Sequence, residues 1–129
     1  MPKRILVVDD ETHIVQVLSL KLRNAGYEVV SAGDGEEAFD LAVRDRPDLV
    51  ITDFQMPYMT GLELARSLAA HAATRGVPVV MLTARGYALD DSELRSAQIT
   101  EVLSKPFSPR AILDLAGRLT GASGEASAA

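Results

Sequence analysis

Three short runs of consecutive apolar residues do most to limit how this chain can fold. Ile5–Val8, Leu49–Thr52 and Val79–Leu82 are rich in β-branched residues and show no alternation of apolar and polar side chains. Such runs are typical of strands covered on both faces, as in parallel sheets. Two weaker segments, Tyr27–Ala32 and Val102–Leu103, complete a set of five predicted strands.

Segments with helical periodicity alternate with these strands. The predicted helices are Thr12–Ala25, 34–45, Gly61–Ala73, Leu89–Ala97 and a last helix that Ser108 caps and that runs to about Leu119. Five strand–helix units in succession imply an α/β fold, a parallel sheet with helices on both faces. We expect one domain over residues 1–119, followed by a small, polar and disordered tail over 120–129.

The net charge and the lack of cysteine exclude several classes of function. A formal net charge of −5 argues against binding to a nucleic-acid backbone, which needs basic patches. Without cysteine, the chain forms neither disulfides nor thiolate metal sites. The apolar run near the N-terminus is too short for a signal peptide or a membrane span. We therefore expect a cytoplasmic protein that binds neither nucleic acid nor membrane.

Polar side chains stand where four of the predicted strands end. They are Asp9 and Asp10 after the first strand, Asp53 after the third, Thr83 after the fourth and Lys105 after the fifth. In an open parallel sheet, the carboxyl ends of the strands form the ligand-binding edge. The topology is therefore expected to bring these residues together, although they are distant in the sequence.

Carboxylates gathered in this way need a counter-charge. Two of them about 4 Å apart repel by about 4 kcal/mol at an effective dielectric constant near 20. Lys105 supplies one positive charge, and a hard divalent cation with oxygen ligands would supply the rest. Mg²⁺ is the ion favoured here, and because it keeps waters and substrate phosphate among its ligands, a phosphorylated ligand is implied.

Four sequence blocks carry a resemblance to a known family. They are VVDDE at 7–11, ITDFQMPYMTG at 51–61, MLTA at 81–84 and LSKPF at 103–107. Together they make the chain similar to the response-regulator receiver domains of bacterial two-component signalling, over residues 3–119. The resemblance implies a doubly wound, flavodoxin-like (βα)5 fold with strand order 2-1-3-4-5.

The resemblance also assigns a phosphoacceptor and a metal site. Asp53 would accept the phosphoryl group from a phosphohistidine on a sensor histidine kinase or a phosphotransfer protein. Asp10 and Asp53 would bind Mg²⁺ through their side chains. Gln55 would bind it through its backbone carbonyl, and Asp9 through a water molecule.

Two further residues would contact the phosphoryl oxygens in a protein of this family. Thr83 would donate its hydroxyl to one oxygen, and Lys105 its ammonium group to another. The resemblance also implies a cis bond between Lys105 and Pro106, which would direct the ammonium group inward. Phosphoryl transfer depends mainly on positioning and charge neutralisation, and these residues supply both.

The chain departs from the family pattern in its switch region. Val102 stands where the family commonly has an aromatic residue whose ring turns inward on activation. We therefore expect signalling through a conformational change in 84–104, with movement of the loop 84–91 and of Tyr87 in place of a ring flip. Gln55 and Arg85 occupy positions that tune the lifetime of the acyl phosphate in the family.

The expected function is a phosphorylation switch with an unknown downstream protein target. It is not expected to be an enzyme beyond phosphotransfer to itself and slow self-dephosphorylation. A phosphorylation-dependent homodimer is a further option in this family. The alternative is a pseudo-receiver that binds partners without phosphorylation, which Val102 would suit. A simpler interpretation of Asp9 and Asp10 is that they cap the first helix.

Overall fold

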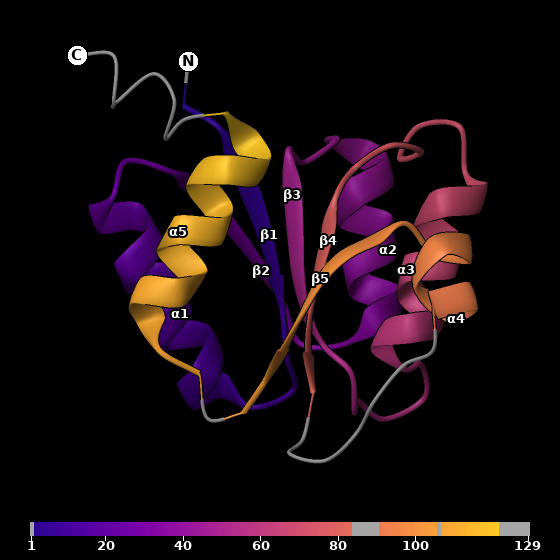
Figure 1. Cartoon of the computed structure of the whole chain (residues 1–129), viewed down its shortest axis with the longest axis horizontal. Helices are drawn as coiled ribbons and strands as arrows, with labels where there is room; N and C mark the ends of the chain where they lie inside the picture. The colour runs from indigo at the N-terminus through magenta and orange to yellow at the C-terminus, as the bar shows by residue number, and fades with distance from the viewer. Residues whose placement is uncertain (1, 84–90, 106, 122–129) are drawn as a thin grey trace.

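A computed structural model of the chain describes residues 2–83, 91–105 and 107–121. A five-stranded parallel sheet lies between two layers of helices (Figure 1). The strands are β1 (Arg4–Val8), β2 (Glu28–Ala32), β3 (Leu49–Asp53), β4 (Val79–Thr83) and β5 (Ile99–Ser104). The helices are α1 (Thr12–Asn24), α2 (Gly35–Arg44), α3 (Gly61–Ala70), α4 (Asp91–Ser96) and α5 (Pro109–Thr120). The strand order β2-β1-β3-β4-β5 confirms the doubly wound, flavodoxin-like sheet.

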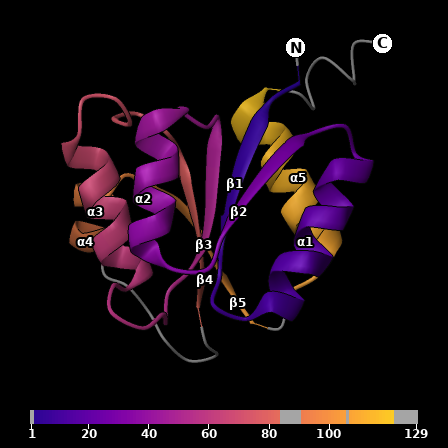
Figure 2. The ribbon, with the colours of Figure 1, turned by 180° about the vertical axis from the view of Figure 1, so that it is seen from behind.

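The inner strands send alternate side chains into two separate layers of the core. In β1, Ile5 and Val7 pack with residues of α1 and α5, whereas Leu6 and Val8 pack with residues of α2 and α3. Figure 2 shows the two layers from behind, with α1 and α5 on one side of the sheet and α2, α3 and α4 on the other. Both faces of β1 are therefore dry, which explains its continuous apolar sequence.

The edge strand β5 is longer than the sequence indicates. The predicted strand covered only Val102–Leu103, whereas β5 runs over Ile99–Ser104. Its one neighbour in the sheet is β4, so part of β5 meets solvent, and Thr100 is exposed. Polar residues at such an edge interrupt the apolar run by which the inner strands are recognised.

Helix α3 is shorter than predicted. It ends at Ala70 rather than Ala73, and the next residue, His71, has extended backbone angles of φ −94° and ψ 130°. The buried hydroxyl of Thr74 donates a hydrogen bond of 2.6 Å to the backbone carbonyl of Leu68. A carbonyl that the helix end would leave without a partner is thereby satisfied. This contact comes from the folded chain, so the alanine-rich sequence does not indicate it.

Two other predicted boundaries lie close to the edges of the described segments. The fourth helix was expected to start at Leu89, which lies outside the described residues, and the described helix begins at Asp91. The last helix continues to Thr120, and Gly121 follows it with a left-handed φ of 82°. The predicted tail stays a prediction, because 122–129 also lies outside the described residues.

The start of α3 lies directly against the end of β3. Thr60 caps the helix together with Glu63, because the Glu63 N–H donates to Thr60 Oγ1 at 3.1 Å and the Thr60 N–H donates to Glu63 Oε1 at 2.9 Å. The Gly61 N–H donates to the Phe54 carbonyl at 2.8 Å. A Cβ atom on Gly61 would overlap the backbone carbonyl of Asp53. Glycine at this position therefore lets α3 approach the end of β3.

We expect the substitution Gly61→Ala to destabilise the domain by roughly 1–3 kcal/mol, the usual cost of forcing extra volume into a packed site. Urea unfolding followed by far-UV circular dichroism measures the change. The control is Gly33→Ala, where the nearest atom to the new Cβ, Glu37 Oε1, is 4.0 Å away. Equal unfolding midpoints for the two variants would contradict the close approach.

Candidate functional site

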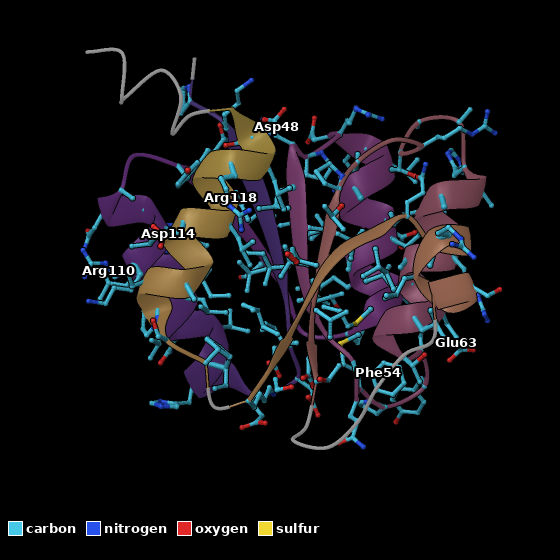
Figure 3. All side chains as sticks on the ribbon, viewed as in Figure 1. Asp48, Phe54, Glu63, Arg110, Asp114 and Arg118 are labelled. Carbon is cyan, nitrogen blue, oxygen red and sulfur yellow. The ribbon has the colours of Figure 1, made fainter. Side chains whose placement is uncertain are left out.

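The carboxyl ends of β1, β3, β4 and β5 meet at one edge of the sheet. The polar residues there are Asp9 and Asp10 after β1, Asp53 at the end of β3, Thr83 at the end of β4 and Lys105 after β5. In Figure 3, Asp48 just before β3 and Phe54 just after it lie at opposite ends of the sheet. The site occupies the Phe54 end, where the chain enters α1 and α3.

Three carboxylates come together at this edge. Asp9, Asp10 and Asp53 each offer an oxygen atom, and these atoms lie within 4.8 Å of one another. Asp9 and Asp53 are buried, and Asp10 is exposed. The arrangement is a partly buried acidic pocket that opens to solvent on the side of Asp10.

The ammonium group of Lys105 is the positive charge inside this pocket. Its Nζ lies 2.8 Å from Asp53 Oδ1, 3.7 Å from Asp9 Oδ2 and 3.8 Å from Glu11 Oε1. The backbone also helps to place this lysine, because the Lys105 N–H donates to the Thr83 carbonyl at 2.8 Å. One ammonium group is thus shared among three carboxylates, with its closest contact at Asp53.

Burial shifts the protonation of these groups. It raises the pKa of Asp9 to about 6, although the hydrogen bond from the Glu11 N–H acts in the other direction. Burial also raises the pKa of Asp53, against the hydrogen bond from Lys105. Burial alone would lower the pKa of Lys105, but the hydrogen bond to Asp53 and the surrounding carboxylates raise it. The pocket therefore holds more negative charge than Lys105 alone offsets.

Two buried polar atoms at this edge have unused bonding capacity. Asp9 Oδ2 and the Thr83 hydroxyl have no hydrogen-bond partner among the residues that the structure describes. Leaving such atoms buried and unpaired is costly, and a bound ion or ligand is one explanation for them. The three carboxylates offer only oxygen ligands, which suit a hard cation such as Mg²⁺. The residues present fit this ion.

The remaining predicted site residues either make none of the pocket contacts named above or lie outside the described residues. Gln55 is exposed in the segment after β3. Val102 is partly buried in β5 and packs against the same core cluster as Leu94 of α4. The predicted roles of Arg85 and Tyr87, and the predicted cis bond before Pro106, concern residues outside the described part of the chain.

The capping interpretation of the first acids does not match the structure. The N-cap residue of α1 is Glu11, and its side chain makes no capping hydrogen bond within the described residues. Asp9 Oδ1 accepts the Glu11 N–H at 2.9 Å, which orders the turn between β1 and α1. Its other oxygen, Oδ2, faces Lys105. Asp9 thus serves the pocket as well as the turn.

Two residues of the site were missed in the sequence. Glu11 belongs to the acidic run but received no role, although its carboxylate approaches Lys105. Its place directly after Asp9 and Asp10 was the available signal. Gly61 was treated only as the start of a helix, and its approach to the Asp53 backbone depends on the packing of α3, which the sequence does not show.

An acidic pocket with an inward lysine, at the carboxyl edge of a doubly wound parallel sheet, matches the class of signalling receiver domains that the sequence resembles. The family model of the response regulator receiver domain matches residues 5–116. The chain belongs to this family and is a receiver domain of two-component signalling.

Relatives with known names support this membership. The chain is 38% identical over 112 residues to the alkaline phosphatase synthesis transcriptional regulatory protein PhoP of Bacillus subtilis, covering 87% of the chain and 46% of PhoP. It is 36% identical over 113 residues to the phosphate regulon transcriptional regulatory protein PhoB of Pseudomonas aeruginosa, covering 86% of the chain and 48% of PhoB. The chain thus spans about half the length of these relatives.

Solved structures agree in fold. The chemotaxis response regulator CheY4 of Vibrio cholerae has a TM-score of 0.84 and 34% identity, covering 92% of this chain and 99% of that one. The receiver domain of the sensor histidine kinase PA1611 of Pseudomonas aeruginosa, solved with a magnesium ion coordinated in its active site cleft, has a TM-score of 0.83 and 30% identity, covering 94% and 99%. None of the described helices has the length and apolar character needed to cross a membrane.

We expect the metal-free domain to gain stability as the pH falls from about 8 to about 5. Because burial raises the pKa of Asp9 to about 6 in the folded state, from 3.8 for a free aspartate, the folded state holds more protons than the unfolded state between these two pKa values. The charged Asp9 carboxylate lowers the free energy of unfolding by roughly 3 kcal/mol. This destabilisation is complete above the folded-state pKa and is absent below the unfolded-state pKa.

Urea unfolding in a chelator at a series of pH values measures this trend. Asp9→Asn is expected to unfold at higher urea than the parent at pH near 7.5 and to show a flatter pH profile. Saturating Mg²⁺ should reverse the order, because the ion stabilises the charged pocket of the parent, and the variant lacks one of its carboxylates. A parent domain whose metal-free stability rises with pH over this range would contradict the shift.

Proposed function

We propose that this domain accepts a phosphoryl group on Asp53 from a phosphohistidine of a sensor histidine kinase or phosphotransfer protein, and that Mg²⁺ is required. The observation that carries the proposal is that the Asp53 carboxylate lies within 4.8 Å of oxygen atoms of Asp9 and Asp10 and 2.8 Å from the Lys105 ammonium group. Asp53 is buried yet lies at the edge of the sheet where ligands bind.

The reaction exchanges one phosphorus bond for another. An oxygen of the Asp53 carboxylate forms a bond to phosphorus as the phosphorus–nitrogen bond of the phosphohistidine breaks. The histidine nitrogen keeps the electron pair of that bond and takes up a proton. Lys105 and the Thr83 hydroxyl would donate hydrogen bonds to the phosphoryl oxygens, and both stand at the same edge as Asp53. Preorganised donors of this kind supply most of the catalysis in phosphoryl transfer.

The metal would be held by the acidic pocket. Asp10 and Asp53 would bind Mg²⁺ directly, Gln55 through its carbonyl, and Asp9 through water. When bound, the ion would neutralise negative charge on the transferring phosphoryl group. The support is the fit of the oxygen-only pocket and the magnesium ion in the similar receiver domain of PA1611.

A groove beside Lys105 supports the kinase as donor. It lies between α1 and the start of α5 and is largely apolar, so a partner helix could rest there with its phosphohistidine close to the pocket. Its other lining residues include Ile14, Val17, Leu18, Phe107 and Pro109.

The downstream partner would be a protein, and that protein would be a second copy of the chain if phosphorylation leads to a homodimer. We place the domain over residues 1–119, in the cytoplasm, with no contact of its own to nucleic acid.

The pseudo-receiver alternative finds little support in the site. Such a protein has no need for the acids, the lysine and the threonine at once, and this chain has all of them at one edge of its sheet. The feature that favoured it, Val102, affects the output of the switch rather than the chemistry at Asp53.

Phosphate labelling tests the proposal. With acetyl phosphate and Mg²⁺, the domain is expected to gain the mass of one phosphoryl group, because a small donor can enter the pocket. Asp53→Asn should gain none, and a chelator should abolish the reaction of the parent. Phosphotransfer from purified histidine kinases then identifies the donor. Labelling that persists in Asp53→Asn would assign the acceptor to another residue.

We further propose that the output runs through 84–104, with the loop 84–91 and Tyr87 replacing the aromatic switch that Val102 lacks. The physical support is the bond from the Lys105 N–H to the Thr83 carbonyl, which joins the ends of β4 and β5 beside the acceptor. Gln55 and Arg85 would set the lifetime of the phosphorylated state.

Nuclear magnetic resonance can follow this output. On phosphorylation, amide shift changes are expected to extend through 84–104, because a contact between Thr83 and the phosphoryl group would pull on both strands. Asp53→Asn under the same conditions is the control and should show no such change. Shift changes confined to the residues around Asp53 would refute this route.

A further inference from the structure

Glu11 stands apart from the other acids of the site. Its side chain is 62% exposed, yet its Oε1 lies 3.8 Å from the Lys105 ammonium group. It is the N-cap residue of α1, but its side chain makes no capping hydrogen bond within the described residues. The Glu11 N–H, which bonds to Asp9, is independent of the side chain. The carboxylate therefore approaches the pocket without an evident structural task.

The charges of the site do not balance while Glu11 is present. Four carboxylates share this edge with a single ammonium group, because Lys105 contacts Asp9, Glu11 and Asp53, and Asp10 lies beside Asp9 and Asp53. A bound divalent cation together with Lys105 offsets three of these negative charges. Glu11 is outside the group of acids that fits a metal ion, so its charge is the one left over at the mouth of the pocket.

We propose that Glu11 is a specificity residue that selects phosphodonors by their charge. The inference rests on the proposed function. The Glu11 carboxylate lies beside the Lys105 ammonium group that would hold the phosphoryl oxygens. It would therefore repel an anionic small donor that reaches Asp53, and it also competes for that ammonium group. Glu11 Oε1 and Asp53 Oδ1 lie 3.8 Å and 2.8 Å from the same atom, Lys105 Nζ. The distance between the two carboxylate oxygens is therefore no more than the sum of these two distances. Repulsion over such a range is felt even near the surface.

A protein donor escapes this penalty more easily than a free metabolite does. Glu11 is exposed, so a docked partner can place a basic side chain against it and cancel its charge. Acetyl phosphate has no basic group that could offset the charge of Glu11, so its own negative charges are repelled. The residue thus lowers phosphorylation by small anionic donors while it leaves a complementary protein donor free to react.

The test compares Glu11→Gln with the parent at saturating Mg²⁺ and low ionic strength. With acetyl phosphate, an oxygen of Asp53 bonds to phosphorus, and acetate leaves with the electrons of the broken phosphorus–oxygen bond. Glu11→Gln is expected to react about three to ten times faster, because the extra negative charge is gone. The gain should be smaller with phosphoramidate, a donor of lower negative charge, and should shrink towards 1 M salt, where charges are screened.

Asp45→Asn is the matched control. It also replaces one exposed carboxylate by an amide, but Asp45 follows α2 and precedes β3, at the opposite end of the sheet. Its labelling rate is expected to equal that of the parent. Glu11→Asp, which keeps the charge, should stay close to the parent as well.

Mg²⁺ affinity gives a readout besides activity. Calorimetric titration of Glu11→Gln is expected to show a dissociation constant about two to three times higher, because a nearby negative charge has been removed. If Glu11→Gln binds Mg²⁺ less tightly but reacts faster at saturating Mg²⁺, its effect is due to the lost charge and not to damage to the site. Unfolding midpoints of Glu11→Gln and parent in chelator should differ little.

The outcomes are distinguishable. If the parent labels on Asp53 but Glu11→Gln is no faster with acetyl phosphate, the inference about Glu11 is wrong and the proposed function stands. An equal gain in Asp45→Asn, or an equal gain with both donors, also overturns it. A parent that takes no label on Asp53 from either small donor or from histidine kinases defeats the proposed function itself, and the inference with it.

Discussion

The contact between the Lys105 ammonium group and the buried Asp53 carboxylate is the constraint on which the site depends. At 2.8 Å it is a charge-assisted hydrogen bond, and it holds the Asp53 carboxylate in a pocket where burial disfavours the charged form. The same ammonium group also faces Asp9 and Glu11. One cation that serves several acids leaves the pocket short of positive charge, and this shortage suits the site to a divalent ion.

The fold makes this crowding tolerable by burying apolar residues behind it. The strands that deliver Asp9 and Asp53 are dry on both faces, so the core beneath the site is packed on two sides. At the edge itself, Gly61 lets α3 approach the end of β3, and the Thr60–Glu63 capping box ends the intervening loop. The stability of these apolar layers offsets the cost of bringing like charges together.

The sequence predicts the parts of this structure that depend on local pattern. The inner strands are recognisable because both of their faces are buried, and Asp34 is recognisable as a cap by the glutamate that follows at Glu37. Features that depend on a distant partner were missed or mistaken. The end of α3 depends on Thr74 bonding back to Leu68, and the length of β5 depends on its pairing with β4. The contact of Glu11 with Lys105 joins two segments far apart in the chain.

Lys105 also links the Asp53 site to the strands β4 and β5, through which the proposed signal would pass. Lys105 follows β5 directly, and its N–H is bonded to the Thr83 carbonyl at the end of β4. A phosphoryl group on Asp53 would compete for the ammonium group and for the Thr83 hydroxyl, which has no partner among the described residues. Both attractions act at the carboxyl ends of β4 and β5. On the proposed function, a change of charge at Asp53 would pull on two adjacent strands. Val102, packed in β5 against the core cluster that includes Leu94 of α4, would move with β5 but has no aromatic ring to turn, so the proposed output runs through the loop that follows β4.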